Sequence, residues 1–205
     1  MRRPHLRRHA DNILCADLTT HEIWTFCGLT TVFILVVMHL KSRTLLLCEA
    51  TLSPHGAWFE QMARNAVMAA EELGIEPKYV IHDRDPLFRY HFDPMLRARG
   101  VKVVRTSRNA PDMNAHVERH IRSIKEECLD QLVILGTRRM DRILEAWKRY
   151  FNEFRPHQGL EQRTPLQVLK GVSLPEPLPD GQVPGQVECV EFLGGLLRAY
   201  RHKAA

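Results

Sequence analysis

The first fifty residues contain three runs of apolar and β-branched residues. The runs cover Ile13 to Thr20, Thr31 to Leu40 and Arg43 to Ala50. The second run is almost wholly apolar, which is typical of a strand that is covered on both faces. The segments between the runs are too short for crossover helices, so the pattern predicts three strands paired as antiparallel neighbours.

Helical and strand patterns alternate over the next hundred residues. Ser53 and Pro54 suit the N-cap and the first turn of a helix, and apolar residues keep helical spacing until Gly74 ends it. The later elements expected are a strand at Lys78 to His82, a short helix to Arg99, a strand at Val101 to Arg105, a helix from Asn114 to about Leu132 and a helix from about Thr137 to Phe154. This order predicts an α/β, ribonuclease-H-like fold with a mixed five-stranded sheet covered by helices.

The chain divides into three segments by composition. Residues 1–11 form a basic N-terminal arm, which is either solvated or in contact with phosphate. Residues 12–170 form the core. Residues 171–205 form a proline- and glycine-rich linker and a C-terminal tail, and the tail is apolar enough between Val187 and Tyr200 to dock on another surface.

The overall charge limits the classes of partner. The chain has 29 Lys and Arg against 24 Asp and Glu, and this excess favours a polyanionic partner without identifying it. The longest strongly apolar run, Val32 to Met38, is far shorter than the ~20 residues of a membrane span. The five cysteines include no Cys-x-x-Cys pair, which argues against a zinc ribbon or a disulfide framework. We therefore expect a cytoplasmic protein with no membrane partner.

Three acids lie in or beside segments that we expect to be buried. An unpaired carboxylate is costly away from water, so its presence there points to a function. Asp17 lies inside the first apolar run, and Asp83 follows the apolar strand 79–81, where α/β sheets place functional groups. Glu118 falls in the first turns of the helix that Asn114 starts. Two strand-borne aspartates and one helix-borne glutamate favour a site for one or two Mg²⁺ (or Mn²⁺) ions, with room for a phosphate and an attacking water or hydroxyl.

The helix that carries Glu118 places two cations beside it. Glu118, Arg122 and Lys125 share one helix face by their spacing. The neighbouring buried stripe is expected to consist of Val117, Ile121, Ile124 and Cys128. A metal-bound phosphate whose strand continues along the helix would meet both cations, but an ordinary surface row of salt bridges explains the same spacing.

Four ordered blocks stand out along the chain. They are Ser42-Arg43; Asp83-Arg84-x-x-x-Phe88; Asn114-Ala115-x-Val117-Glu118-Arg119 with Lys125; and Tyr150-x-Asn152-x-x-Arg155-Pro156-His157-x-x-Leu160 with Thr164-Pro165. Together they resemble the integrase core family, which is shared by retroviral integrases and bacterial insertion-sequence transposases. The 34 residues between Asp83 and Glu118 are close to the usual separation in that family. The resemblance covers about residues 11 to 170.

The resemblance implies a polynucleotidyl transferase, the catalytic core of a DNA transposase or integrase that cleaves phosphodiester bonds and transfers strands. It implies Asp17, Asp83 and Glu118 as catalytic residues that bind Mg²⁺ or Mn²⁺. The expected DNA contacts are Asn114, Arg119, Arg122 and Lys125. Such an enzyme is expected to act as a homo-oligomer on DNA, and relatives usually carry a helix-turn-helix region that recognises the element ends. This chain begins almost at the first catalytic strand, so we expect a separate helix-turn-helix subunit or a missing N-terminal region.

The second block departs from the family pattern. Relatives usually read Asp-Arg-Gly-Ser, whereas Asp85-Pro86 follows Arg84 here. Asp85 is therefore a second candidate for the metal ligand, but the spacing to Phe88 favours Asp83. His39 stands where many relatives have an aspartate that is not counted among the metal ligands.

Several side chains have a structural interpretation beside the functional one. His116 and His120 share a helix face as zinc ligands do, but no third ligand is nearby, so zinc is disfavoured. His82 either tunes the site or bonds to the backbone. Arg155 and His157 either fix the turn after the last helix or contact DNA.

Two other functions share most of these features. A ribonuclease-H-fold nuclease that cuts without joining would use the same acids, and an inactive DNA-binding remnant of a transposase would keep the fold. The Tyr-Asn-Arg-Pro-His block favours strand transfer over the nuclease. The missing recognition region argues for the remnant, but the intact set of three acids argues against it, so we expect a strand-transfer enzyme.

Overall fold

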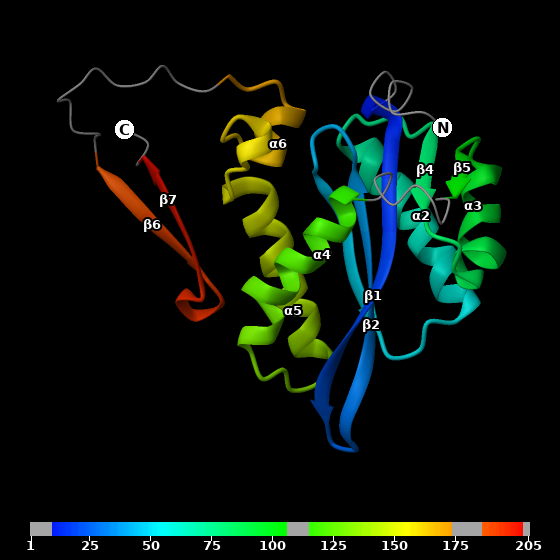
Figure 1. The fold of residues 1–205 in the computed structure, drawn as a ribbon, viewed down its shortest axis with the longest axis horizontal. Coiled ribbons are helices and arrows are strands. Elements are labelled where there is room, and N and C mark those ends of the chain that lie inside the picture. The colour runs from blue at the N-terminus through cyan, green and yellow to red at the C-terminus, as the bar shows by residue number, and fades with distance from the viewer. Residues whose placement is uncertain (1–9, 106–114, 174–185, 203–205) are drawn as a thin grey trace.

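A five-stranded mixed sheet forms the centre of the molecule, in a computed structural model that describes residues 10–105, 115–173 and 186–202 (Figure 1). The strand order is β3-β2-β1-β4-β5. The strands are β1 (Ile13–Thr25), β2 (Gly28–His39), β3 (Leu45–Thr51), β4 (Tyr79–His82) and β5 (Lys102–Arg105). The first three pair antiparallel, whereas β4 is parallel to β1 and β5 is parallel to β4. The predicted mixed five-stranded sheet is therefore confirmed.

The hairpin of β1 and β2 is longer than the apolar runs predict. β1 continues to Thr25 rather than ending near Thr20, because it stays paired with β2 until Thr25 meets Gly28 at the tip. Gly28 has a φ of +99°, a backbone conformation that glycine adopts without steric cost. The tip leaves Trp24 and Phe26 exposed, and it projects beyond the rest of the sheet in Figure 1. Pairing with β2, not the length of the apolar run, sets the end of this strand.

Helices cover both faces of the sheet. They are α2 (Gly56–Glu72), α3 (Asp93–Ala98), α4 (Ala115–Glu127), α5 (Thr137–Arg149) and α6 (Pro165–Leu169). Figure 1 shows α2 and α3 on one side of the sheet and α4 and α5 on the other. Along β1, Cys15 packs into the core beneath α4 and α5, while its neighbours Leu14 and Ala16 pack into the core beneath α2 and α3. Alternation along a strand thus decides which helix layer each side chain meets.

Two predicted helix boundaries are wrong. α2 begins at Gly56 rather than at Pro54, because His55 is the N-cap and its Nδ1 accepts a hydrogen bond from the N–H of Trp58 at 3.2 Å. Ser53 instead donates its N–H to the hydroxyl of Thr51 in a local turn. α4 ends at Glu127 rather than near residue 132, because a separate 3-10 turn follows at 129–131.

A π turn, Tyr150–Phe154, continues α5 and ties it to β3. The Oδ1 atom of the buried Asn152 accepts a hydrogen bond from Leu45 N at 2.8 Å, and its Nδ2 donates to Leu45 O at 2.9 Å. One turn earlier, Lys148 Nζ donates to Leu46 O at 2.6 Å. These bonds fix the end of α5 against the start of β3.

A C-terminal hairpin packs on the same π turn. β6 (Val187–Phe192) and β7 (Leu197–His202) pair antiparallel, and the ring of Phe192 lies 5.6 Å from that of Tyr150 and 5.2 Å from that of Phe154. The apolar tail therefore docks on α5. The division into a linker and a tail stays a prediction, because residues 174–185 lie outside the described part. Among the described helices, none has both the length and the apolar character of a membrane span.

Candidate active site

Asp17 and Asp83 come from neighbouring parallel strands. In the register of β1 and β4, Cys15 lies beside Ile81, and each aspartate follows two residues later. Side chains two residues apart share a face of a strand, and both Cys15 and Ile81 belong to the core beneath α4 and α5. Asp17 therefore lies on the face that α4 covers, and Asp83 follows directly after the end of β4, near enough for its charge to raise the pKa of Asp17.

Glu118 approaches this pair from α4. The helix packs inward through Val117 and Ile124, which leaves Glu118 exposed in the first turn. The pKa of Asp17 is raised to about 6 by burial and by the nearby charges of Asp83 and Glu118, against a hydrogen bond from Leu18 N at 2.9 Å that lowers it. The three carboxylates, which come from three separate elements, thus repel one another across a common space.

The chemistry of these three side chains fits a hard divalent cation. Carboxylate oxygens are the ligands that Mg²⁺ prefers, and a cation would relieve the repulsion among the three acids. Within the described residues, no three His, Cys, Asp or Glu side chains lie close enough together to enclose a metal ion. Asp83 and Glu118 are both exposed, so each has room to turn toward a cation. Asp17, Asp83 and Glu118 are therefore the side chains that would hold Mg²⁺ or Mn²⁺.

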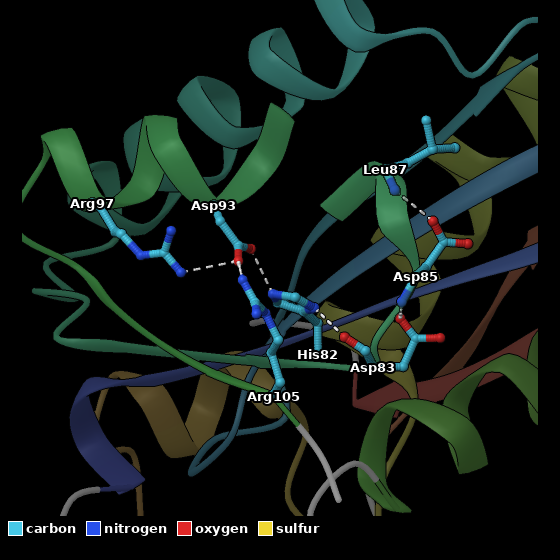
Figure 2. A network of polar contacts seen from close by, with 7 residues as sticks. All are labelled: His82, Asp83, Asp85, Leu87, Asp93, Arg97 and Arg105. Carbon is cyan, nitrogen blue, oxygen red and sulfur yellow. Dashed lines mark hydrogen bonds and ion pairs between the residues drawn. The ribbon is translucent and has the colours of Figure 1, made fainter. Parts of the chain in front are cut away.

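A buried ionic network supports the backbone of Asp83 (Figure 2). The Nδ1 atom of His82 bonds the carbonyl oxygen of Asp83 at 2.6 Å, and its Nε2 bonds Oδ1 of Asp93 at 2.7 Å. The other oxygen of Asp93 accepts hydrogen bonds from Arg105 at 2.7 Å and Arg97 at 3.2 Å. Both ring nitrogens of His82 face oxygen acceptors, so both contacts are satisfied only when each nitrogen carries a proton. The network fixes the end of β4 from which Asp83 projects.

Asp93 is fully buried, yet its pKa is lowered. Burial by itself raises the pKa of this carboxyl, but the hydrogen bonds and charges of His82 and Arg105 outweigh that effect. Sequence reasoning missed this role, because Asp93-Pro94 looks like an ordinary helix start, and it does begin α3. His82 bonds to the backbone, which is one of the two interpretations that the sequence allows, and it also bonds to Asp93.

Asp85 serves the turn that follows Asp83. Its Oδ1 accepts a hydrogen bond from Leu87 N at 2.8 Å, and its own N–H donates to Oδ1 of Asp83 at 3.1 Å (Figure 2). The Asp85 side chain therefore caps the following helical turn. Of the two acids, Asp83 is the one whose charge raises the pKa of Asp17.

Comparison with known proteins bears on this arrangement. Residues 99–165 match the family described as the integrase core domain. The insertion element IS407 uncharacterized 31.7 kDa protein of Burkholderia multivorans is 30% identical over 114 residues, which are 55% of this chain and 41% of that protein. The insertion element IS476 uncharacterized 39.2 kDa protein of Xanthomonas euvesicatoria is 25% identical over 92 residues, which are 44% of this chain and 27% of that protein. The match to the integrase core domain thus lies within one part of the chain, and the insertion-element proteins are similar to a longer stretch of it. The chain spans less than half the length of either relative.

Solved structures of integrase cores share the fold of this chain. The HTLV-2 integrase catalytic core domain in complex with magnesium, in its trimeric form, superposes with a TM-score of 0.57 at 15% identity, over 77% of this chain and 95% of that one. The catalytic core domain of BIV integrase superposes with a TM-score of 0.55 at 14% identity, over 77% of this chain and 93% of that one. At these identities the likeness concerns the fold alone, and it confirms the predicted ribonuclease-H-like fold.

The predicted DNA contacts that the structure describes lie on two sides of α4. Arg122 is exposed and Lys125 is half-buried, and both follow Glu118 along its helix face. Arg119 points to another side of the helix, where it lines a pocket. Asn114 lies outside the described residues. Arg119 therefore does not share the helix face on which Arg122 and Lys125 follow Glu118.

His120 is buried and packs against aromatic side chains. It is 2% exposed, and its ring lies 4.5 Å from that of Phe151, measured between centroids. Its Nε2 accepts a hydrogen bond from Trp147 Nε1 at 3.4 Å. That nitrogen is therefore occupied by the indole, which leaves only Nδ1 of the ring for any other contact.

Proposed function

We propose that this chain is the catalytic core of a DNA transposase or integrase, which cleaves phosphodiester bonds and transfers DNA strands with Mg²⁺ or Mn²⁺. The observation that carries the proposal is the approach of Asp83 and Glu118 to the half-buried Asp17, whose pKa is raised to about 6 first by burial and then by the charges of those two acids. Among the described residues no basic side chain pairs with Asp17, and acids gathered without such a partner are typical of a functional site. The match of residues 99–165 to the integrase core domain supports the reaction class.

The three acids would bind the metal, and the cations along α4 would position the DNA. When bound, Mg²⁺ would supply positive charge at the reacting phosphate and favour loss of the proton from the attacking water or hydroxyl. Arg122 and Lys125 follow Glu118 along α4, so we assign them to the phosphates of the strand that continues past the cut. His82 holds the backbone of Asp83 in place, which makes it a positioning residue for that ligand.

We further propose DNA and a second copy of the chain as its partners. Solved relatives of the same fold are described as trimeric and dimeric forms of an integrase core, and one as an intasome of simian T-cell lymphotropic virus. If each active site acts on one DNA end, the cutting and joining of two ends requires two active sites in one assembly. Sedimentation of the chain with and without DNA would measure this directly.

The test is metal-dependent nicking of supercoiled plasmid, followed by joining of an oligonucleotide 3′-hydroxyl to that plasmid. We expect nicking in Mg²⁺ or Mn²⁺ and none in chelator. Asp83→Asn should reduce nicking at least ~100-fold, because a lost metal ligand removes several kcal/mol of transition-state stabilisation. Asp85→Asn is the matched control, since it changes a neighbouring acid whose side chain caps a turn.

A second pair of variants tests the helix-borne ligand. Glu118→Gln should abolish nicking and joining, while Glu126→Gln, an exposed glutamate of the same helix, should leave both unchanged. Nicking without joining in the unmodified chain would replace the proposal with a nuclease. Nicking that persists in Glu118→Gln or in chelator would refute the assignment of the three acids. If no metal tested supports nicking by the unmodified chain, the proposal would be replaced by an inactive DNA-binding remnant of a transposase.

A further inference from the structure

A pocket of about 310 Å³ lies on the side of α4 away from Glu118. Three segments far apart in the sequence form it: the turn between β2 and β3, the helix α4, and residues 155–159 after α5. From α4, His116, His120 and Ser123 line it, and at ~100° per residue they lie on roughly the opposite side of the helix from Glu118. Its volume is about ten times that of a water molecule in the liquid, so it can hold a small polar group.

The pocket concentrates positive charge. Arg43, Arg119 and Arg155 line it, and none of the lining residues that the structure describes is an acid. Burial and the neighbouring Arg119 lower the pKa of Arg43. Burial, together with Arg155 and Arg43, lowers the pKa of His157 to about 4, so this imidazole is neutral at pH 7. Arg155 is paired with Glu127, but among the described residues the charges of Arg43 and Arg119 have no such partner, so an anion in the pocket would compensate them.

Buried nitrogen atoms at the pocket have no hydrogen-bond partner. They are Nδ1 of His120, Nη1 of Arg155 and Nε2 of His157, each without a partner among the described residues. His120 is itself only 2% exposed. Leaving a buried polar atom unsatisfied is costly, so three of them around one cavity indicate that a ligand or ordered water completes the site.

The arginines are held in place before any ligand arrives. Arg43 has a φ of +60° and donates from Nη2 to the carbonyl oxygen of Gly159 at 3.2 Å. Arg155 donates from Nη2 to Glu127 at 2.6 Å, and its guanidinium lies 5.8 Å from the ring centroid of Trp147. Only one edge of the Arg155 guanidinium is therefore engaged. Fixed guanidinium groups with free N–H donors are well suited to the oxygens of a phosphate.

We propose that this pocket binds a phosphate group of a nucleic-acid strand. The choice of nucleic acid rests on the proposed function, whereas the choice of phosphate rests on the three arginines and the unpartnered nitrogens. A strand held here would cross α4 on the side opposite Glu118, so the helix would lie between two DNA segments. The phosphate is either an internal diester or a terminal monoester, and the monoester carries more negative charge.

The first experiment measures binding without chemistry. A fluorescently labelled single-stranded oligonucleotide, with either a 5′-phosphate or a 5′-hydroxyl, is titrated with the purified chain in chelator, and inorganic phosphate is added as a competitor. If the 5′-phosphorylated strand binds more tightly and inorganic phosphate competes with it, the pocket binds a terminal monoester. Equal binding of the two strands, with loss in the pocket variants described next, identifies an internal diester.

The variants separate the pocket from general charge. Arg43→Gln with Arg119→Gln should weaken binding at least ~10-fold, because the double variant removes the charge-assisted hydrogen bonds of two guanidinium groups to the phosphate. The matched control is Arg139→Gln with Arg142→Gln, two exposed arginines of α5 outside the pocket. It removes the same charge, and we expect it to change binding less than ~2-fold at fixed salt.

A third variant keeps the charge and moves one arginine. A Cβ atom at Gly159 would lie 2.6 Å from Nη2 of Arg43, so Gly159→Ala must push that guanidinium aside. We expect weaker phosphate binding with an unchanged melting temperature. Equal losses in the pocket double variant and the α5 double variant, or no loss in any variant that melts like the parent, would overturn the inference. Because chelator excludes cutting, a chain that binds phosphate here but never nicks DNA would refute only the proposed function.

Discussion

Asp17 and Asp93 are both withdrawn from water, but their surroundings differ. Asp93 is fully buried and contacts three basic side chains, those of His82, Arg97 and Arg105. Its pKa is lowered, because these partners outweigh the effect of burial. Asp17 is half-buried, accepts a hydrogen bond from the N–H of Leu18, and feels two other acids. Its pKa is raised to about 6 by burial and by those acids.

This contrast separates a structural acid from a functional one. A fold that needs a buried carboxylate for stability pairs it with cations, as happens at Asp93, because an uncompensated buried charge is costly. No described basic side chain gives Asp17 that compensation, and the acids Asp83 and Glu118 approach it from two other segments instead. An arrangement that lowers stability persists where it serves binding or catalysis. The two aspartates should therefore respond in opposite ways to the same substitution.

The largest expected effect is on catalysis. Asp17→Asn removes a charge that the metal needs, and we expect Mg²⁺-dependent nicking to fall at least ~1000-fold, which corresponds to about 4 kcal/mol. Circular dichroism should show an unchanged fold. Asp130→Asn is the control, because Asp130 is an exposed acid near His21. Full nicking activity in Asp17→Asn would remove the distinction between the two aspartates.

The next effect is on stability. Asp93→Asn keeps the shape of the side chain but leaves His82 and Arg105 without a counter-charge, so we expect a loss of about 2–3 kcal/mol in the free energy of unfolding by urea. Asp141→Asn changes an aspartate exposed on α5 and should stay within about 0.5 kcal/mol of the parent. If the two variants unfold at the same urea concentration, the Asp93 network contributes nothing to stability.

The pH dependence of stability should have opposite signs for the two acids. The pKa of Asp17 is raised in the folded state, so its contribution is fully present below the unfolded value near 3.8 and is lost as pH rises through about 6. Asp93 has a lowered pKa, so its contribution is present above its unfolded pKa and is lost as pH falls through the folded one. Relative to the parent, Asp17→Asn should therefore gain on the order of 1–2 kcal/mol above pH 6. Urea unfolding over that range measures the difference, and a variant less stable than the parent at neutral pH would contradict it.

The smallest expected effect is stabilisation by the metal itself. At a Mg²⁺ concentration about ten times its dissociation constant, binding to the folded chain contributes about 1.4 kcal/mol, which raises the melting temperature by roughly 3–5 °C. Asp17→Asn should lose this shift, whereas Asp93→Asn should keep it. Differential scanning fluorimetry with and without Mg²⁺ gives both values, and an equal shift in the parent and in Asp17→Asn would place the metal elsewhere.

Much of the fold follows from local patterns in the sequence. β2 is recognisable because a strand covered on both faces is apolar throughout, as in Val32 to Met38. Glu118 can be placed on an exposed helix face by its spacing from the buried Val117 and Ile124. The start of α2 was misplaced, because Ser53-Pro54 satisfies the usual capping rule, but Ser53 is taken up in a turn with Thr51.

Other features of the site depend on contacts between distant segments. The bond from Arg43 to Gly159 joins positions 116 residues apart, and no local pattern marks either residue as part of a pocket. The burial of Asp93 likewise depends on β4 and β5 lying side by side, which places His82 and Arg105 next to α3. The family resemblance identified Arg155 and His157 as candidates, but it could not show that their free nitrogens face one cavity.

The side chain of Asn152 has a consequence for how the molecule behaves at high concentration. β3 is the outermost strand of the sheet, and the outer edge of a sheet is a template on which another chain can add a strand and begin an aggregate. Asn152 bonds both the N–H and the carbonyl of Leu45, as a neighbouring strand would, and Lys148 occupies the carbonyl of Leu46. The end of α5 therefore closes the first part of this edge to foreign strands, and a chain that loses Asn152 would expose it to self-association.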